Sequence, residues 1–241
     1  MAASAAIDPT GEQITAATSQ RRSSGASTAT VGVDATQRPA WSTAASPTRV
    51  CVATTTFGTE MAATHEAARP PALDGLLSDD CWREASVTSP FISAQGGAVE
   101  EQQTQVRACY DATSLYIGIE AFDTLLQPAL NMLHQVRAQQ LGRDADVFSD
   151  DCVEVFLAPT AESYYHFASN SATGTYDGQA TDGGWNCDWH CAARRGAVSY
   201  VVEMAMPFSA LSASPGDPWR ASFTRTRSAD GHLSTWSGLV E

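Results

Sequence analysis

The sequence predicts an all-β fold for residues 69–241, an antiparallel β-sandwich of jelly-roll-like form with one or two short helical excursions. Three observations support this prediction. The apolar periodicity after residue 70 is mostly two, the apolar runs are short, and Gly, Pro, Asn and Asp separate them at regular intervals. Regularly spaced short strands joined by turns are typical of a sandwich or barrel.

The expected elements follow one another through the chain. Residues 103–110 and 115–122 form a predicted hairpin with a turn at 111–114, because apolar side chains alternate along the second strand. Further strands are expected at 152–157, 164–169, 174–177, 188–193, 199–206 and 219–227. Two helical segments interrupt them: 78–84, with Ser78 as its N-cap, and 125–141, with helical apolar spacing and Pro128 near its start.

The first 68 residues differ from the rest in composition. They are rich in Ala, Ser and Thr and hold few aromatic residues. Such a segment cannot bury enough apolar surface to offset the entropy of ordering it. We therefore expect 1–68 to be a disordered leader or linker and 69–241 to be the folded domain. Neither a signal peptide nor an apolar run long enough to span a bilayer is visible in the sequence.

Charge excludes several functions. All 14 basic residues are Arg, so chemistry that depends on a Lys, such as a Schiff base or a Lys-containing phosphate loop, is excluded. The net charge of −13 disfavours nucleic acid and anionic membranes as partners, since both require a basic surface. Neutral polar ligands remain.

The six cysteines do not form a zinc pattern, because no two of them are spaced as CxxC. We expect buried free thiols. Cys187 and Cys191 would lie about 13 Å apart along a strand, too far for a disulfide between them, while pairing with other cysteines stays open.

Several local patterns occur in an order that resembles the family 9 carbohydrate-binding modules. They are ALDG at 72–75, CW at 81–82, TQVRACYD at 104–111, LYIGI at 115–119, DDCVEVFL at 150–157, YHFASN at 165–170, GTYD at 174–177, VEMAMPF at 202–208 and WRASFTR at 219–225. The resemblance implies a β-sandwich that binds sugar. Trp82 and Trp189 are expected to be core residues, with Trp82 covering one end of the sandwich.

The resemblance also implies a site. Two Trp sandwich a terminal sugar in that family; the first falls on Phe148, and polar site positions fall on Glu154, His166 and Asn170. The family's binding Arg falls on Ala168, and its second Trp would lie beyond Glu241, which suggests a truncated C-terminus.

Trp185 lies in a Gly-rich turn and is the expected substitute for the absent ring. Family members bind structural calcium, so Asp144, Asp146 and Asp150 are candidate calcium ligands, with a solvated acidic loop as the alternative.

We therefore expect non-catalytic carbohydrate binding, to a β-glucan or xylan-type polysaccharide or its ends, in support of a glycoside hydrolase or a surface assembly in carbohydrate catabolism. The resemblance implies an extracellular or cell-envelope location. Asp151 and Glu154 would point to opposite faces of one strand and could not flank a glycosidic bond, and no GxSxG motif occurs.

Two alternatives stay open. One is a structural sandwich whose sugar site is lost. The other is an electron-transfer sandwich that holds haem through Met204 or Met206 and His166 or His190.

Overall fold

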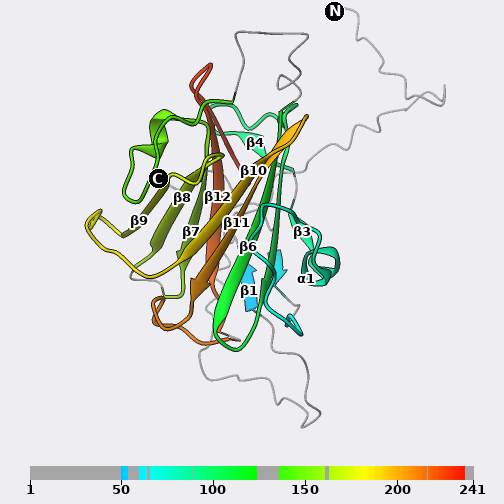
Figure 1. Cartoon of the computed structure of the whole chain (residues 1–241), viewed down its shortest axis with the longest axis vertical. Coiled ribbons are helices and arrows are strands. Elements are labelled where there is room, and N and C mark those ends of the chain that lie inside the picture. Colours follow the sequence, from blue (N-terminus) through cyan, green and yellow to red (C-terminus); the bar gives the residue numbers. More distant parts are fainter. Residues whose placement is uncertain are drawn as a thin grey trace, which may run out of the picture. The chain divides into compact units, whose positions relative to one another are not determined.

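Figure 1 shows the fold in a computed structural model of the chain. The structure describes residues 50–53, 60–63, 66–88, 90–123, 136–160, 163–215 and 217–236, all within one compact unit, residues 45–241. The strands are β1 (Val50–Ala53), β2 (Glu60–Ala63), β3 (Val87–Thr88), β4 (Ile92–Ser93), β5 (Thr104–Tyr110), β6 (Ser114–Phe122), β7 (Cys152–Ala158), β8 (Tyr165–Asn170), β9 (Thr175–Gln179), β10 (His190–Arg195), β11 (Ser199–Pro207), β12 (Arg220–Arg227) and β13 (His232–Thr235). The helical elements are α1 (Asp80–Glu84) and the 3-10 turn η2 (Val147–Ser149).

Two antiparallel sheets form the layers of a sandwich. One has the strand order β10-β11-β6-β5-β3 and the other the order β4-β13-β12-β7-β8-β9. Every strand predicted from the sequence is present, with bounds that differ by two residues or fewer. The all-β antiparallel sandwich is therefore confirmed. The short strands β3, β4 and β13 were not predicted, since two to four residues carry too little periodicity to recognise.

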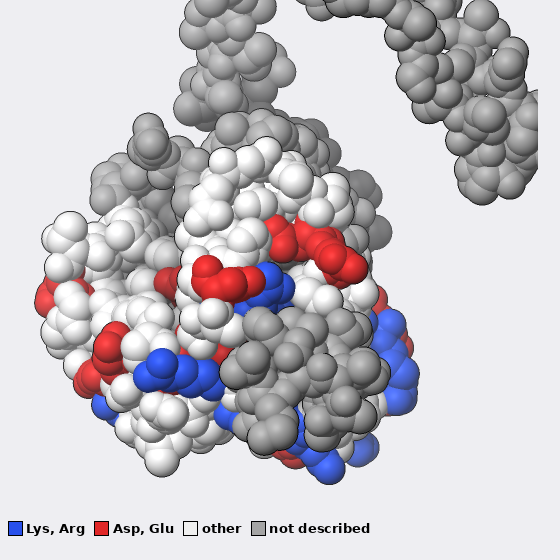
Figure 2. All heavy atoms as spheres, turned by 90° about the horizontal axis from the view of Figure 1, so that it is seen from above, with Lys and Arg blue, Asp and Glu red and all other residues white. Residues whose placement is uncertain are grey.

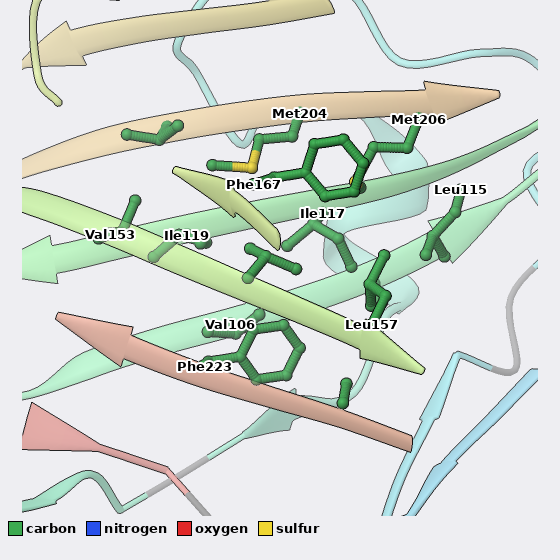
Figure 3. Close-up of a cluster of buried hydrophobic side chains, with 14 of the residues drawn as sticks. Val106, Leu115, Ile117, Ile119, Val153, Leu157, Phe167, Met204, Met206 and Phe223 are labelled. Carbon is green, nitrogen blue, oxygen red and sulfur yellow. The ribbon is translucent and has the colours of Figure 1, made fainter. Parts of the chain in front are cut away.

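The core lies between the two sheets. Alternate residues of β5, β6 and β11 meet alternate residues of β7, β8 and β12, and Figure 3 shows Ile117, Met204, Phe167 and Phe223 among these inward side chains. All four are at most 1% exposed. Because successive side chains of a strand point to opposite faces, the residues between them line the outer face of each sheet.

The two predicted helices have different outcomes. The first is confirmed as α1, although its N-cap is Asp79 rather than Ser78 and makes no capping bond through its side chain. The second, predicted for 125–141, lies largely outside the described residues. Residues 136–141, which the structure describes, are not helical, and Val136 is buried in the core between the sheets.

The folded part begins earlier than predicted. Ala67 is buried and donates a backbone hydrogen bond of 2.7 Å to Tyr110 O, so the domain includes residues 66–68. Strands β1 and β2 pair with each other within the segment predicted to be disordered. Residues 1–49 lie outside the described residues, and their disorder stays a prediction.

Residues 67–85, which precede β3, cover the outer face of the five-stranded sheet. Trp82 of α1 packs there, 1% exposed, in a cluster with Cys109, Tyr116 and Ala205. Trp82 is therefore a core residue, as predicted, but it covers a sheet face rather than one end of the sandwich. Gly118 makes the approach possible, because a Cβ at that position would lie 2.5 Å from Leu77 and 3.2 Å from the Trp82 ring.

Glu203 of β11 fixes this covering segment. Its buried carboxylate accepts hydrogen bonds from Gly75 N at 2.6 Å, Asp74 N at 2.9 Å and Trp82 Nε1 at 2.8 Å. Gly75 has φ +76 and lies against Arg194, so a side chain would be both strained and obstructed. The motifs at 72–75, 81–82 and 202–208 thus meet in one contact.

Five cysteines are free: Cys81, Cys109 and Cys152 are buried as predicted, whereas Cys187 and Cys191 are half-buried. Burial raises the pKa of each of the three buried thiols, which keeps them protonated. Within the described part of the chain, no helix is long and apolar enough to cross a membrane.

Candidate functional site

The outer face of the six-stranded sheet is left partly open over β7, β8 and β9. Glu154 and Phe156 point outward from β7, and His166, directly opposite Phe156 in the antiparallel register, points outward from β8. Tyr176 lies on the same face of β9, beside Ala168. Phe148, from η2, and Tyr164, which directly precedes β8, are 39% and 40% exposed.

Glu154 and His166 form the polar centre of this face. Glu154 Oε1 accepts a hydrogen bond of 2.8 Å from Thr224 Oγ1, and Glu154 Oε2 lies 2.9 Å from His166 Nε2. Because a carboxylate only accepts, the proton of the second contact lies on Nε2. In the neutral imidazole, Nδ1 is then an acceptor, so the pair is oriented and offers a ligand hydroxyl further acceptor positions.

Four rings form a continuous line, which we call the aromatic row: Phe148, His166, Phe156 and Tyr164. The centroid distances from one ring to the next are 5.6, 4.2 and 6.0 Å. Phe156 and His166 are stacked at an interplanar angle of 17°, whereas the other two pairs are tilted. The row has one exposed ring at each end.

Tyr176 lies beside the row, with its ring centroid 5.0 Å from that of Phe148 and 5.2 Å from that of His166. A Cβ on Gly178 would lie 2.7 Å from its hydroxyl and one on Gly183 3.1 Å from it, so these glycines leave room for the phenol. Burial raises the pKa of Tyr176, and the nearby Asp144 carboxylate raises it further. The hydroxyl therefore stays protonated and can donate.

The η2 segment covers the other part of this face. Val147, fully buried, packs on Cys152 and Ala168. The resemblance placed the family's binding Arg at Ala168, and a long charged side chain there would be buried beneath Val147 without solvent. The packing of η2 therefore leaves no room for an Arg at this position.

Asn170 is a structural residue in this arrangement. Its Nδ2 donates to Gln140 O at 2.7 Å and to Asp150 Oδ2 at 2.9 Å, and its Oδ1 accepts from Ala172 N and Gly174 N. The side chain is fully buried. All of its donors are engaged within the loops, so the structure does not present Asn170 to a ligand as the resemblance implied.

The acidic run is not gathered into one cluster. Asp150 is fully buried and accepts from Gln139 N and Gln140 N at 2.8 Å, whereas Asp144 and Asp146 are exposed. Among the described residues, no group of three or more His, Cys, Asp or Glu side chains could hold a metal ion. The packing of Asp150 instead secures residues 137–140.

Trp185 lies on the other side of the sheet from the aromatic row. Its ring is 5.0 Å from Tyr165 and 6.2 Å from Phe167, both of which point into the core, and it packs at the edge of that core. The structure therefore does not bring Trp185 to Phe148. Trp189 is buried, as predicted.

The Arg side chains of this region are paired. Arg143 contacts both carboxylate oxygens of the buried Asp177, at 2.9 and 2.8 Å, and also donates to Asn186 Oδ1 and Cys187 O. In Figure 2 acidic and Arg side chains lie next to one another at several places on the face shown. Arg143 thus connects the loop before η2 to the loop after β9.

The geometry does not support the haem alternative. Met204 and Met206 point into the core from β11, whereas His166 is on the outer face of the other sheet. His190 lies opposite Ala205, whose side chain points away from the core side of β11. The methionines and histidines therefore do not converge on one group.

The two carboxylates weighed for hydrolysis are also separated. Asp151 is 2% exposed and bonded to Arg137 N, Ser228 N and Ser228 Oγ, while Glu154 lies on the outer face. They cannot act together on one glycosidic bond.

A two-sheet sandwich with an uncovered aromatic face and an oriented His–Glu pair defines a module built to bind a ligand. The chain belongs to the carbohydrate family 9 binding domain-like family, whose model matches residues 73–231. No curated protein matches the chain.

Several solved structures of low sequence identity are similar to the chain, and the first of them shares its fold. A candidate carbohydrate-binding protein from Bacteroides uniformis ATCC 8492 is 15% identical, with 73% of this chain and 87% of that chain covered and a TM-score of 0.55. A family 9 carbohydrate-binding module from Caldicellulosiruptor kristjanssonii, in complex with cellotriose, is 18% identical, with 71% and 80% covered and a TM-score of 0.47. A glucose complex of a family 9 module from the same organism has the same identity and TM-score, with 71% and 82% covered.

Sequence reasoning located three of the residues on this face, Phe148, Glu154 and His166. It missed Phe156, Tyr164, Tyr176 and Thr224. The signal for two of them was available, because Phe156 follows Glu154 by two positions and Tyr164 precedes His166 by two, which is the same-face spacing of a strand.

Proposed function

We propose that the uncovered outer face of the six-stranded sheet binds carbohydrate without cleaving it. The observation that carries the proposal is the aromatic row next to the His166–Glu154 pair. Aromatic rings cover the apolar C–H surface of a pyranose, and oriented carboxylate and imidazole groups accept from its hydroxyls. Both kinds of group lie together here: Phe148 and Tyr164 are exposed at the two ends of the row, and the His166 and Glu154 side chains keep 16% and 13% of their surface accessible.

We take the ligand class to be β-glucan or xylan-type polysaccharide, and the location to be extracellular or at the cell envelope. Family membership supports both parts of this proposal. A glycoside hydrolase or a surface assembly would then be the context in which the domain concentrates an enzyme on its polysaccharide.

Calorimetric titration of the whole chain with xylo- and cello-oligosaccharides tests the proposal. Heat is the appropriate signal, because every described Trp is buried or packed at the core, away from the aromatic row. Saturable heat with at least one series supports sugar binding. The absence of heat with both series contradicts it and favours a sandwich that has lost its site.

Glu154→Gln provides the site-specific version of the test. The amide keeps the size of the side chain but removes its charge and replaces one acceptor oxygen with a donor, so the hydrogen bond to either Thr224 or His166 must reverse its direction. We expect affinity to fall by about 1.5 to 3 kcal/mol, the usual value of a hydrogen bond to a charged group. Unchanged affinity would place the ligand elsewhere.

A further inference from the structure

Among the described residues, the rings of the outer face that contact one another leave no slot between them. Every ring pair recorded among Phe148, Phe156, Tyr164, His166 and Tyr176 has a centroid distance between 4.2 and 6.0 Å. A sugar held between two rings needs a carbon–carbon contact on each of its faces, so the two rings must be at least about 7 Å apart. None of these pairs can hold a sugar ring between its members.

His166 fills the space between Phe148 and Phe156, where a sugar ring would otherwise have to fit. Its imidazole stacks on Phe156 at 4.2 Å and contacts Phe148 at 5.6 Å, and its bond to Glu154 keeps the ring in this position. The side chain is tied to two strands, because Glu154 is itself held by Thr224 of β12. Moving the His166 ring away from Phe156 would break its hydrogen bond to Glu154.

A ligand must therefore lie over the rings rather than between them. The two ends of the aromatic row, Phe148 and Tyr164, are the exposed ones, at 39% and 40%, and the two rings that join them are partly buried. Along the row, the rings come in turn from η2, from β8, from β7 and from Tyr164, the residue directly before β8. This is an elongated surface with an open ring at each end, and nothing in the row encloses a chain terminus.

We propose that the site binds internal units of an extended glycan along the line from Phe148 to Tyr164 and does not require a free reducing end. This inference rests on the proposed function. His166, one of the two middle rings of the row, and its partner Glu154 meet hydroxyls of a central unit, while the outer units cover the two exposed rings.

Reduction of the terminal sugar separates the two binding modes. The whole chain is titrated with cellotetraose and with the same tetrasaccharide after borohydride reduction, in which only the last ring is opened. Side-on binding predicts dissociation constants that agree within about threefold, since three intact units remain to cover the row.

Binding of cellotetraose with loss of more than about tenfold on reduction would overturn the inference and leave the proposed function in place. Absence of binding by both forms, and by xylotetraose and its reduced form titrated in the same way, would overturn the proposed function and this inference with it. The two failures are therefore distinguishable in one experiment.

Tyr164→Ala gives a second readout that depends on ligand length. Tyr164 is at one end of the row, so its removal should weaken cellotetraose at least fivefold and leave cellobiose bound at the Phe148 end within twofold. Val198→Ala is the matched control: this residue of similar exposure, 41%, lies in the turn between β10 and β11 of the other sheet, so the change should affect neither ligand. An equal effect of Tyr164→Ala on both lengths, or none on either, would contradict binding along the row.

Discussion

The outer faces of the two sheets differ in how far the rest of the chain covers them. On the five-stranded sheet, residues 67–85 cover the face, and Glu203 satisfies two backbone N–H groups and the Trp82 indole. On the six-stranded sheet, η2 covers the part over Cys152 and Ala168, and Phe148 and Tyr164 keep exposed rings. Each face has aromatic rings close to a Glu carboxylate, Trp82 with Glu203 on one and Phe156 with Glu154 on the other. Residue type alone therefore does not distinguish a structural cluster from a binding site.

What separates them is whether the chain itself fills the face. Trp82 is 1% exposed, whereas Phe148 and Tyr164 retain 39% and 40% of their surface. A buried aromatic residue contributes to folding, while an exposed ring contributes to binding only when a ligand covers it. Changes to the covered face should therefore lower stability, and changes to the open face should lower affinity.

The largest effect is expected for Trp82→Ala. Removing this side chain leaves a cavity over the five-stranded sheet and orphans one oxygen of Glu203, which should cost about 3 to 5 kcal/mol of the free energy of unfolding. Urea denaturation measures this loss. Trp82→Phe keeps most of the packing and removes the hydrogen bond alone, so it should cost less. A loss below about 1 kcal/mol for Trp82→Ala would contradict the covered-face account.

The next effect concerns Asn170, which the resemblance implied to be a sugar ligand. Asn170→Ala removes four hydrogen bonds that connect residues 140, 150, 172 and 174, and should lower the free energy of unfolding by roughly 2 to 4 kcal/mol. Asn170→Asp would place a second carboxylate against Asp150 and should be more harmful at neutral pH than near pH 4. A stable Asn170→Ala protein that has lost only sugar affinity would restore the original assignment.

Phe148→Ala should show the reverse pattern. The ring is largely exposed, so the free energy of unfolding should change by less than about 1 kcal/mol. Sugar affinity should fall by about 1 to 3 kcal/mol, or 5- to 150-fold, if the ring is desolvated by the ligand. Calorimetry and denaturation of the same preparation make the comparison, and unchanged affinity would move the ligand off this ring.

The smallest effect is a pH dependence from Glu203. Burial raises the pKa of this carboxyl above its ordinary 4.5, although hydrogen bonds from Gly75, Asp74 and Trp82 oppose the shift. Between 4.5 and the raised value, the folded state binds more protons than the unfolded state. Its contribution to stability therefore falls as pH rises through that window.

Glu203→Gln removes this titration. We subtract the free energy of unfolding of Glu203→Gln from that of the original protein, each measured by denaturation at a series of pH values. This difference should decrease as pH rises through the window above 4.5. A difference that grows with pH in that range would show that the pKa is lowered instead.

The sequence predicted the fold well because a period of two survives in every long strand. It also identified the motifs that contain Gly75, Trp82 and Glu203, but not that they meet, since Glu203 is more than 120 positions from each of the other two residues. Long-range contacts of this kind leave no local pattern.

The candidate site could be predicted only in part. Glu154 and His166 share a face because of strand alternation, which is visible in the sequence. The role of Asn170 depends on Gln140, 30 residues earlier, and the orientation of Trp185 depends on Tyr165 and Phe167. Loop packing decided both, and residue spacing does not encode it.

A crystal structure of the domain with bound cellotetraose tests the central claim most directly. The account predicts sugar density over the aromatic row, with hydroxyls within hydrogen-bond distance of Glu154 and His166 and no sugar on the five-stranded sheet. Sugar bound on another surface, with the row left empty, would contradict it.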